Sequence, residues 1–340
     1  MNETLLRLHP DADISAVGRA LQGLGVWART FEDSDRSASV RLSPMSASVP
    51  DTVLADIPGV ATVSVGSKPH PMLDHWRGKA VQIRPGLQVG PGAPATLFAG
   101  PCGVESQAQI RAAARMVSRA GGRLLRGGAY KPRTSPHAFQ GHGESALVWL
   151  REAADALGLA VVTEALSERH VSHVAEMADL IQVGSRNMQN FALLAAVGAT
   201  GRPVLLKRGA SATLLEWRLA GEHLLVAGAS GVIFCERGMS GLGGESELRN
   251  TLDLAGAVAM RHSHGLATIA DPSHATGRRD LVVPLVRASL AAGLDGVMIE
   301  VHPNPADARS DGPQALTQPG LDQVAASFES HADAHEKDTR

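Results

Sequence analysis

Hydrophobic positions divide the chain into two parts with different patterns. The first part has extended runs near residues 5–8, 26–31, 39–42 and 60–65, with helical patterns at 14–24 and near 52–57. Asp13 precedes the first helical pattern, where a carboxylate satisfies free backbone amides, and Gly25 follows its end. This βαββαβ order predicts a small ferredoxin-like α+β domain over residues 1–68.

Residues 69–94 show no clean period. Prolines and glycines alternate with short polar runs, as is typical of a connection between structured parts. We therefore expect a linker here, with one short strand around residues 81–83.

From residue 96 onward the pattern repeats. Short apolar runs, each followed by a longer segment of helical period, occur at 96–99, 123–125, 161–163, 180–183, 204–206, 232–235, 267–270 and 296–299. Leu147, Leu150 and Ala154, for example, lie along one face of a helix. Eight strand-then-helix units in about 240 residues are the number and length of a (β/α)₈ TIM barrel. We assign the barrel to residues 95–332 and a polar tail to 333–340.

A doubly wound open sheet is the alternative fold for such a pattern. It would more often show five or six units, and a glycine-rich phosphate turn after its first strand. The turn at residues 100–103 reads Gly-Pro-Cys-Gly, which is not the dinucleotide-binding fingerprint. The pattern therefore favours the barrel.

Composition narrows the function classes. The 340 residues are 44% hydrophobic and 19% charged, which excludes a disordered chain, and the net charge of -2 argues against a general nucleic-acid binder. No uninterrupted apolar run reaches the ~18 residues of a membrane span, and the N-terminus lacks a signal-peptide pattern. Two cysteines form no disulfide framework and fit a reducing compartment. We expect a cytoplasmic protein.

The residues that end the predicted strands carry most of the chemistry. Barrels place their active sites at the carboxyl ends of the strands, so these side chains should meet. They are Cys102; Arg126, Lys131 and Arg133; Glu164; Ser185 and Arg186; Lys207 and Arg208; Glu236 and Arg237; Asp271 and His274; Glu300, His302 and Asp311. The cations come from units two, four, five and six, whereas the thiol, the imidazoles and several carboxylates come from units one, seven and eight. Two adjoining halves of one site are expected.

The cationic half suits a small anion. Guanidinium groups bind carboxylate or phosphate with two parallel hydrogen bonds, and ammonium groups add compact charges. The cage would consist of Arg126, Lys131, Arg186, Lys207 and Arg237. A solvated or ion-paired surface position explains a single cation equally well, but not the placement of this set at the strand ends.

The other half suits a metal. Cys102, His274, Glu300 and Asp311 offer sulfur, nitrogen and carboxylate oxygen, a mixed set for Mn²⁺, Co²⁺, Fe²⁺ or Zn²⁺. Taken singly, Cys102 reads as a buried apolar residue and His274 as a hydrogen-bonded histidine. Only their expected meeting on units one, seven and eight favours a metal site.

The same strand ends resemble a known family. Matching segments are 99–102, 125–135, 139–141, 163–164, 181–182, 186–190, 206–209, 235–238, 271–279, 300–303 and 310–314. The chain resembles the 3-deoxy-D-arabino-heptulosonate 7-phosphate (DAHP) synthases, in the type I beta form with an N-terminal ferredoxin-like regulatory domain. The Lys-Pro-Arg-Thr-Ser segment at 131–135 is its most specific motif. The glycine-rich loop at 239–248 departs from the family and leaves the aldose preference open.

The resemblance implies a reaction and a role for each site residue. The enzyme would join phosphoenolpyruvate to erythrose 4-phosphate in the first step of the shikimate pathway, with Lys131 and Glu164 as catalytic residues. The implied metal ligands are Cys102, His274, Glu300 and Asp311, with Mn²⁺ preferred. Phosphoenolpyruvate contacts would be Arg126, Lys131, Ser185, Arg186, Lys207 and Arg237, and erythrose 4-phosphate contacts Arg133, Thr134 and Ser135. A homo-oligomer, a tetramer or a dimer, is expected, and the N-terminal domain would bind an aromatic amino acid or have a purely structural role.

Three other functions remain open at this point. The sister synthase, which makes an octulosonate from arabinose 5-phosphate, shares the barrel but lacks the Lys131–Ser135 motif. A paralogue of specialised metabolism would use another short aldose phosphate. The third is a non-catalytic phosphate-binding regulator on the same barrel. Loss of a metal ligand would favour this function, but all four implied ligands are present.

Overall fold

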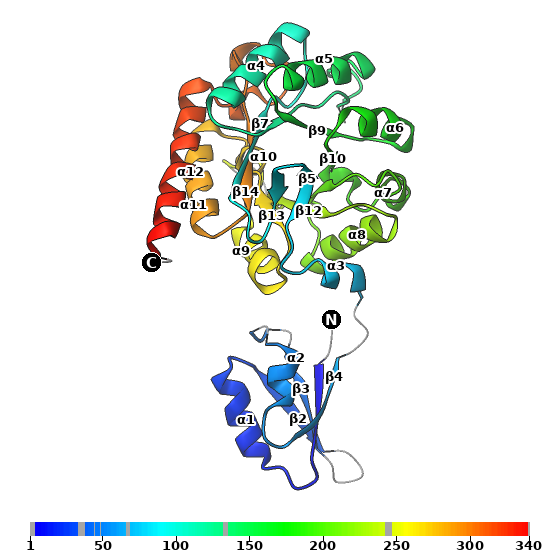
Figure 1. Cartoon of the computed structure of the whole chain (residues 1–340), viewed down its shortest axis with the longest axis vertical. Helices are drawn as coiled ribbons and strands as arrows, with labels where there is room; N and C mark the ends of the chain where they lie inside the picture. The colour runs from blue at the N-terminus through cyan, green and yellow to red at the C-terminus, as the bar shows by residue number, and fades with distance from the viewer. Residues whose placement is uncertain are drawn as a thin grey trace. The chain divides into compact units, whose positions relative to one another are not determined.

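The computed structural model describes residues 4–32, 38–43, 45–47, 49–65, 69–131, 135–241 and 247–338. Two compact units make up the chain, Met1–Pro71 and Met72–Arg340 (Figure 1). Within the described residues, no helix is both long and apolar enough to cross a membrane.

The N-terminal unit is an antiparallel sheet with two helices. Its order is β1 (Thr4–Leu8), α1 (Ile14–Gly23), β2 (Ala28–Glu32), β3 (Ala38–Leu42), α2 (Asp51–Ala55) and β4 (Val60–Val65). The strands pair in the order β2-β3-β1-β4. Leu6 and Leu8 of β1 pack with Val17 and Leu21 of α1 in one small core. The observed elements follow the predicted βαββαβ order, and the Asp13 side chain caps α1 by accepting from the Ala16 amide at 3.0 Å.

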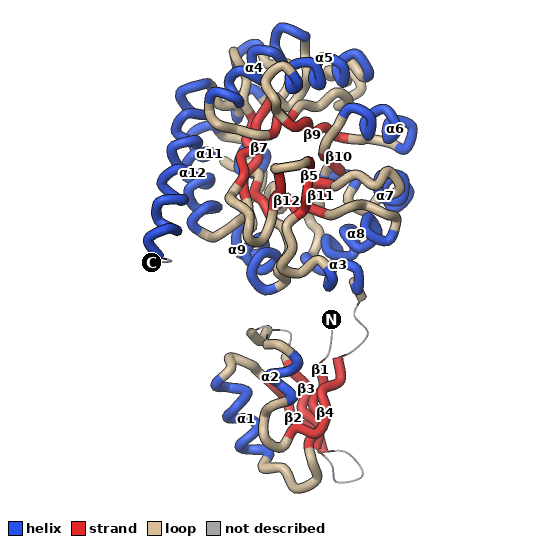
Figure 2. The backbone as a smooth tube through the Cα atoms, in the orientation of Figure 1, coloured by secondary structure: helices blue, strands red, loops and turns tan. Residues whose placement is uncertain are grey.

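The second unit is a closed barrel of eight parallel strands, which confirms the predicted TIM-barrel fold. Figure 2 shows these strands inside a ring of helices. The strands are β7 (Thr96–Gly100), β8 (Leu124–Arg126), β9 (Ala160–Glu164), β10 (Leu180–Val183), β11 (Val204–Lys207), β12 (Val232–Glu236), β13 (Thr268–Ala270) and β14 (Gly296–Glu300).

Helices cover the outside of the barrel. They are α4 (Gln107–Arg119), α5 (Glu144–Asp155), α6 (Glu168–Met177), α7 (Phe191–Gly198), α8 (Leu214–Val226), α9 (Leu254–Val258), α11 (Arg279–Ala291) and α12 (Gln318–Asp338). The short helix α10 (Pro272–Thr276) is fully buried and follows β13. Short turns η1 (Ser185–Asn187) and η4 (Gly312–Gln314) lie after β10 and β14. Helix α12 extends through residue 338 and so includes most of the segment expected to be a polar tail.

Residues 72–94 belong to the barrel unit and differ from the expected linker. They contain the end of α3 (Pro71–His75) and an antiparallel hairpin, β5 (Val81–Arg84) and β6 (Leu87–Val89). Val81 and Leu87, each 1% exposed, pack against the interior barrel residues Phe98 and Met298. The hairpin thus contributes to the inner core, and the division between the units falls after Pro71 instead of within a long connection.

Candidate metal and anion site

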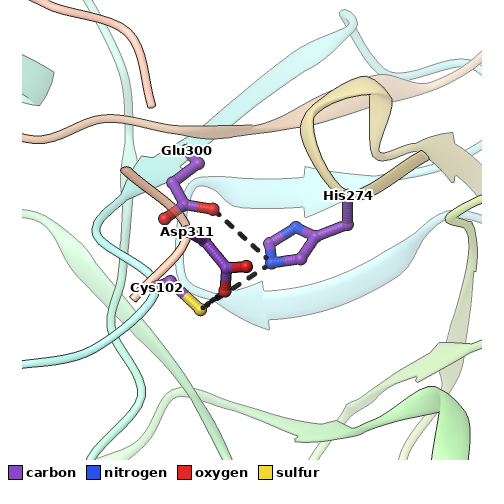
Figure 3. Close-up of side chains that lie close together, drawn as sticks. All are labelled: Cys102, His274, Glu300 and Asp311. Carbon is purple, nitrogen blue, oxygen red and sulfur yellow. Dashed lines mark hydrogen bonds and ion pairs between the residues drawn. The ribbon is translucent and has the colours of Figure 1, made fainter. Parts of the chain in front are cut away.

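Four potential metal ligands converge at the carboxyl end of the barrel. Cys102 follows β7, His274 lies on α10, Glu300 ends β14 and Asp311 precedes η4 (Figure 3). One ligand atom from each residue lies within 4.8 Å of the others. The Cys102 sulfur is 2.8 Å from Oδ2 of Asp311 and 3.8 Å from Nε2 of His274, which is 3.6 Å from Oε2 of Glu300. The predicted meeting of these side chains is therefore observed.

Local structure holds the two carboxylates in place. Asp311 has φ 57°, the only positive value at a non-glycine position among the described residues. This left-handed conformation costs ~1–2 kcal/mol, so the surrounding contacts must maintain it. Arg249 donates to Oδ1 of Asp311 at 2.9 Å, and the Gln314 amide donates to Oε2 of Glu300 at 2.7 Å. Each acid is thus tied to a neighbouring loop.

Burial sets the protonation of the cluster. Burial raises the pKa of the Cys102 thiol, and it raises the pKa of Glu300 to about 8. Burial also lowers the pKa of His274 to about 3, so this imidazole is neutral near pH 7 and can offer a lone pair. Burial alone would raise the pKa of Asp311, but His274 and the Cys102 hydrogen bond hold it well below its usual range. A divalent cation bound here would favour the ionised forms of the Cys102 thiol and the Glu300 carboxyl, because metal ligands bind in their deprotonated forms.

The cations share one cavity with three of these ligands. The cavity has a volume of about 310 Å³, and its lining includes Cys102, His274 and Asp311. It also includes all the predicted cage residues, Arg126, Lys131, Arg186, Lys207 and Arg237, together with Ser135, Glu164 and Ser185. The two halves predicted from the strand ends therefore adjoin in a single cavity.

The electrostatics of the cage favour an anionic ligand. Nη1 of Arg126 is buried and has no hydrogen-bond partner within the described part of the chain. The side chain of Arg186 forms no ion pair with any residue that the structure describes. Burial is the largest effect on the pKa of Arg237 and lowers it. The nearby Arg249 and Arg186 lower this pKa further, although Asp271 opposes the shift. A carboxylate or phosphate in the cavity would satisfy these groups.

Lys131, in the segment after β8, and Glu164, at the end of β9, line the same cavity. Nζ of Lys131 donates to the sulfur and to the carbonyl oxygen of Cys102, both at 2.7 Å. The Glu164 carboxylate, at the end of β9, accepts from the Gln182 amide at 3.1 Å. Lys131 thus offers an ammonium group beside the potential metal ligands, and Glu164 offers a separate carboxylate. Such groups can transfer protons at two different atoms.

Some of the residues predicted for the site are not observed at the cavity. Arg133 and Thr134 fall outside the described residues, and only Ser135 of that predicted trio is seen at the cavity. Arg208 is buried away from the cavity, where it pairs with Glu236 at 3.0 Å and with Asp253 at 2.6 Å. Its charge is neutralised inside the protein, so its role is structural.

Two polar residues that line the cavity were not predicted from the sequence. Gln182 lies one residue before the end of β10, and Arg249 comes from the segment after the glycine-rich loop. Neither follows a strand end, which was the criterion used. The segment 181–182 did occur in the family resemblance and was the one available signal for Gln182.

Comparisons with known proteins agree on one family. Residues 77–335 match the model of the DAHP synthetase I family. A phospho-2-dehydro-3-deoxyheptonate aldolase from Thermotoga maritima is 50% identical over 221 residues, which span 65% of this chain and 65% of that relative's length. A 2-dehydro-3-deoxyphosphooctonate aldolase from Acidithiobacillus ferrooxidans is 31% identical over 248 residues, 68% of this chain and 86% of that relative.

A solved structure matches nearly the whole chain. The Thermotoga maritima phospho-2-dehydro-3-deoxyheptonate aldolase (DAHP synthase) superimposes with a TM-score of 0.74 at 36% identity, covering 98% of both chains. Fold and site together define a (β/α)₈-barrel enzyme of the aldol-condensation transferase type. The chain belongs to the DAHP synthetase I family.

Proposed function

We propose that the chain condenses phosphoenolpyruvate with erythrose 4-phosphate and releases phosphate, giving 3-deoxy-D-arabino-heptulosonate 7-phosphate. The observation that carries this proposal is the single cavity of about 310 Å³ that joins a set of metal ligands to a cage of cations. Such a cavity accommodates a small, multiply charged substrate beside a Lewis acid. The 50% identity to the Thermotoga maritima relative supports the same reaction.

The metal site is proposed from the chemistry of its ligands. One sulfur, one neutral imidazole nitrogen and two carboxylates suit Mn²⁺, our first choice, and also Co²⁺, Fe²⁺ or Zn²⁺. Cys102, His274, Glu300 and Asp311 would hold the ion. When bound, it would polarise the aldehyde oxygen of erythrose 4-phosphate and make the aldehyde carbon a better electrophile.

The cage would bind and orient phosphoenolpyruvate. Arg126, Arg186, Lys207 and Arg237 would contact its carboxylate and phosphate, with Lys131 and Ser185 beside them. The Ser185 hydroxyl donates to the Arg208 carbonyl at 2.7 Å, which leaves its oxygen lone pairs and backbone for the ligand. Holding both ends of the molecule places its C3 toward the aldehyde and removes much of the entropic cost of the reaction.

Two proton transfers would follow from the positions of Lys131 and Glu164. When C3 of phosphoenolpyruvate bonds to the aldehyde carbon, the aldehyde oxygen becomes an alkoxide and C2 becomes electron-poor. Lys131, beside the metal ligands, would protonate the alkoxide. Glu164 would take a proton from the water that adds to C2, and phosphate would leave from the resulting hemiketal. Arg133, Thr134 and Ser135 would hold the phosphate of erythrose 4-phosphate.

The test is a panel of aldose phosphates. Metal-stripped protein is reconstituted with Mn²⁺, and phosphate release from phosphoenolpyruvate is measured with erythrose 4-phosphate, arabinose 5-phosphate and ribose 5-phosphate. We expect release to be fastest with erythrose 4-phosphate and to disappear in a Lys131→Met variant. Faster release with arabinose 5-phosphate would favour the octulosonate synthase, and faster release with ribose 5-phosphate a paralogue with another aldose. No release with any of them would favour the non-catalytic regulator.

The N-terminal unit is proposed to be regulatory. Its sheet and helices form a separate compact unit, and the cavity described above is lined only by residues of the barrel unit. We expect tyrosine, phenylalanine or tryptophan to inhibit the full chain but not a variant without residues 1–68. Equal inhibition of both proteins, or no inhibition of either, would favour a purely structural role for the N-terminal unit.

The family relationship also supports a cytoplasmic homo-oligomer, either a tetramer or a dimer. Light scattering would measure the number of subunits.

A further inference from the structure

We infer that Asp271 is a positioning residue that holds the imidazole of His274 and the ammonium group of Lys207 in one fixed arrangement. The inference rests on the proposed function, which assigns His274 to the metal and Lys207 to phosphoenolpyruvate. Asp271 follows β13 and is 0% exposed. It is not among the residues that line the cavity, so it acts through the two side chains it contacts.

Both oxygens of the Asp271 carboxylate are used. Oδ1 accepts from the backbone amide of His274 at 3.0 Å, and Nδ1 of the His274 ring lies 3.1 Å from Oδ1 and 2.9 Å from Oδ2. Oδ2 also accepts from Nζ of Lys207 at 2.5 Å. A buried carboxylate with this many partners has one stable orientation, because each lost contact would leave a charged group unsatisfied.

The contact with Nδ1 determines which ring nitrogen is free. An ionised carboxylate only accepts hydrogen bonds, so Nδ1 of His274 must carry the ring hydrogen. The lone pair is then on Nε2, which faces the Cys102 sulfur at 3.8 Å and Oε2 of Glu300 at 3.6 Å. Asp271 therefore presents the metal-binding nitrogen to the other ligands.

The contact with Lys207 extends the same arrangement to the anion cage. Lys207 ends β11, is 4% exposed and lines the cavity. A long lysine side chain has many rotamers, and its pairing with a fixed carboxylate selects one of them. Asp271 thus connects the metal half of the site to the anion half through two hydrogen bonds.

The experiment replaces Asp271 with asparagine, which has nearly the same shape. An amide has one acceptor oxygen, and its NH2 group only donates. In either orientation the NH2 group would face a donor, which is Nζ of Lys207 in one case and the His274 backbone amide in the other. We expect the affinity for Mn²⁺, measured by competition with a chromophoric chelator, to fall ~10–100-fold. Calorimetry on metal-free protein should show weaker binding of phosphoenolpyruvate. Nitrogen NMR should show the Nδ1–H tautomer of His274 in the native protein and its loss in the variant.

A matched control is Asp295→Asn. Asp295 is also a buried carboxylate, 4% exposed, and accepts from Arg261 at 2.7 Å and from the Thr268 amide at 2.8 Å at the amino end of the barrel. This control should leave both affinities unchanged. Thermal unfolding of both variants shows whether either loses its fold.

Two results would overturn the inference. One is an Asp271→Asn protein with the Mn²⁺ and phosphoenolpyruvate affinities of the Asp295→Asn control. The other is a native metal-free protein in which His274 carries its hydrogen on Nε2, and this measurement decides the question even when the variant does not fold. Absence of phosphate release with every aldose would refute the proposed function, whereas chelator competition and the tautomer would still test Asp271.

Discussion

An alanine at position 184 should raise the activation barrier of the reaction by more than it lowers the free energy of unfolding. Gly184 lies between β10 and η1 with φ −73° and ψ 159°, a backbone conformation that alanine adopts without strain. A Cβ atom there would lie 2.0 Å from Oε1 of Glu164, whereas ordinary contact begins near 3.4 Å. In the alanine variant the carboxylate must therefore move by more than ~1 Å. In the native protein, the absence of a side chain at Gly184 leaves the space that this carboxylate occupies.

The expected losses of stability and of turnover both follow from the displacement of the Glu164 carboxylate. Glu164 is displaced at the end of a flexible side chain and loses the Gln182 hydrogen bond, so the cost in stability stays within ~1–2 kcal/mol. A displacement of ~1 Å in a reacting group lowers turnover ~100-fold, or about 2.7 kcal/mol of barrier. The KM for phosphoenolpyruvate should change little, because the cage cations are not touched.

The assay is phosphate release at saturating substrates, with thermal unfolding measured in parallel. The control is Gly198→Ala, where a Cβ atom would lie 2.5 Å from Cβ of Ala227 and 2.6 Å from the Leu224 carbonyl oxygen, far from the site on α7. That variant should lose stability and keep its turnover. Normal turnover in Gly184→Ala protein would refute the role given to the Glu164 carboxylate.

Three further changes have defined outcomes. Cys102→Ala or His274→Ala should abolish metal-dependent phosphate release while circular dichroism remains native; full activity in metal-stripped mutant protein would contradict the ligand assignment. Arg309→Leu removes a guanidinium 3.9 Å from the Phe139 ring centre, a contact of ~1 kcal/mol, and should lower the free energy of unfolding by about that amount in urea; an unchanged unfolding curve would count against it. Burial raises the pKa of Asp295, so the folded state binds more protons and native stability falls as pH rises from the ordinary aspartate range to the raised value; urea unfolding should show that this component is missing in Asp295→Asn, and parallel pH curves would contradict it.

The repeated hydrophobic pattern was sufficient to predict the barrel but not its strand ends. Strand β11, for example, was expected to end at Leu206, whereas Lys207 still pairs with Cys235 of β12. A strand ends where its backbone pairing stops, and hydrophobicity reports only the side chains. Five charged residues therefore belong to the strands themselves, which places them more rigidly than loop residues would be; they are Arg126, Glu164, Lys207, Glu236 and Glu300.

The hairpin at residues 81–89 shows a second limit of sequence patterns. Its strands are only four and three residues long, and they read as fragments within a segment rich in glycine and proline. What makes them part of the core is the barrel interior that Val81 and Leu87 enter, and those partners come from distant strands. A local pattern does not contain such tertiary information.

Residue types at the strand ends were enough to predict most of the side chains that meet, because barrel topology brings every strand end to one face. Arg208 is an exception, since it pairs with Glu236 and Asp253 away from the cavity. The contacts between them were beyond this reasoning. Arg249 reaches Asp311 from a loop whose course no periodicity describes. Asp271 was seen as a strand-end carboxylate, but its simultaneous bonds to Lys207 and His274 depend on rotamers that only the packed structure defines.

Arg126 shows why the two halves of the site work together. Its Nη2 lies 3.3 Å from Nε2 of His274, while its buried Nη1 has no partner among the described residues. The guanidinium therefore contacts the nitrogen assigned to the metal and also has a donor available for an anion. A cation held by His274 and an anion held by Arg126 would each reduce the electrostatic cost of burying the other. In the same way, Asp271 contacts both the proposed metal ligand His274 and the cage residue Lys207, so a shift in one half of the site would reach the other.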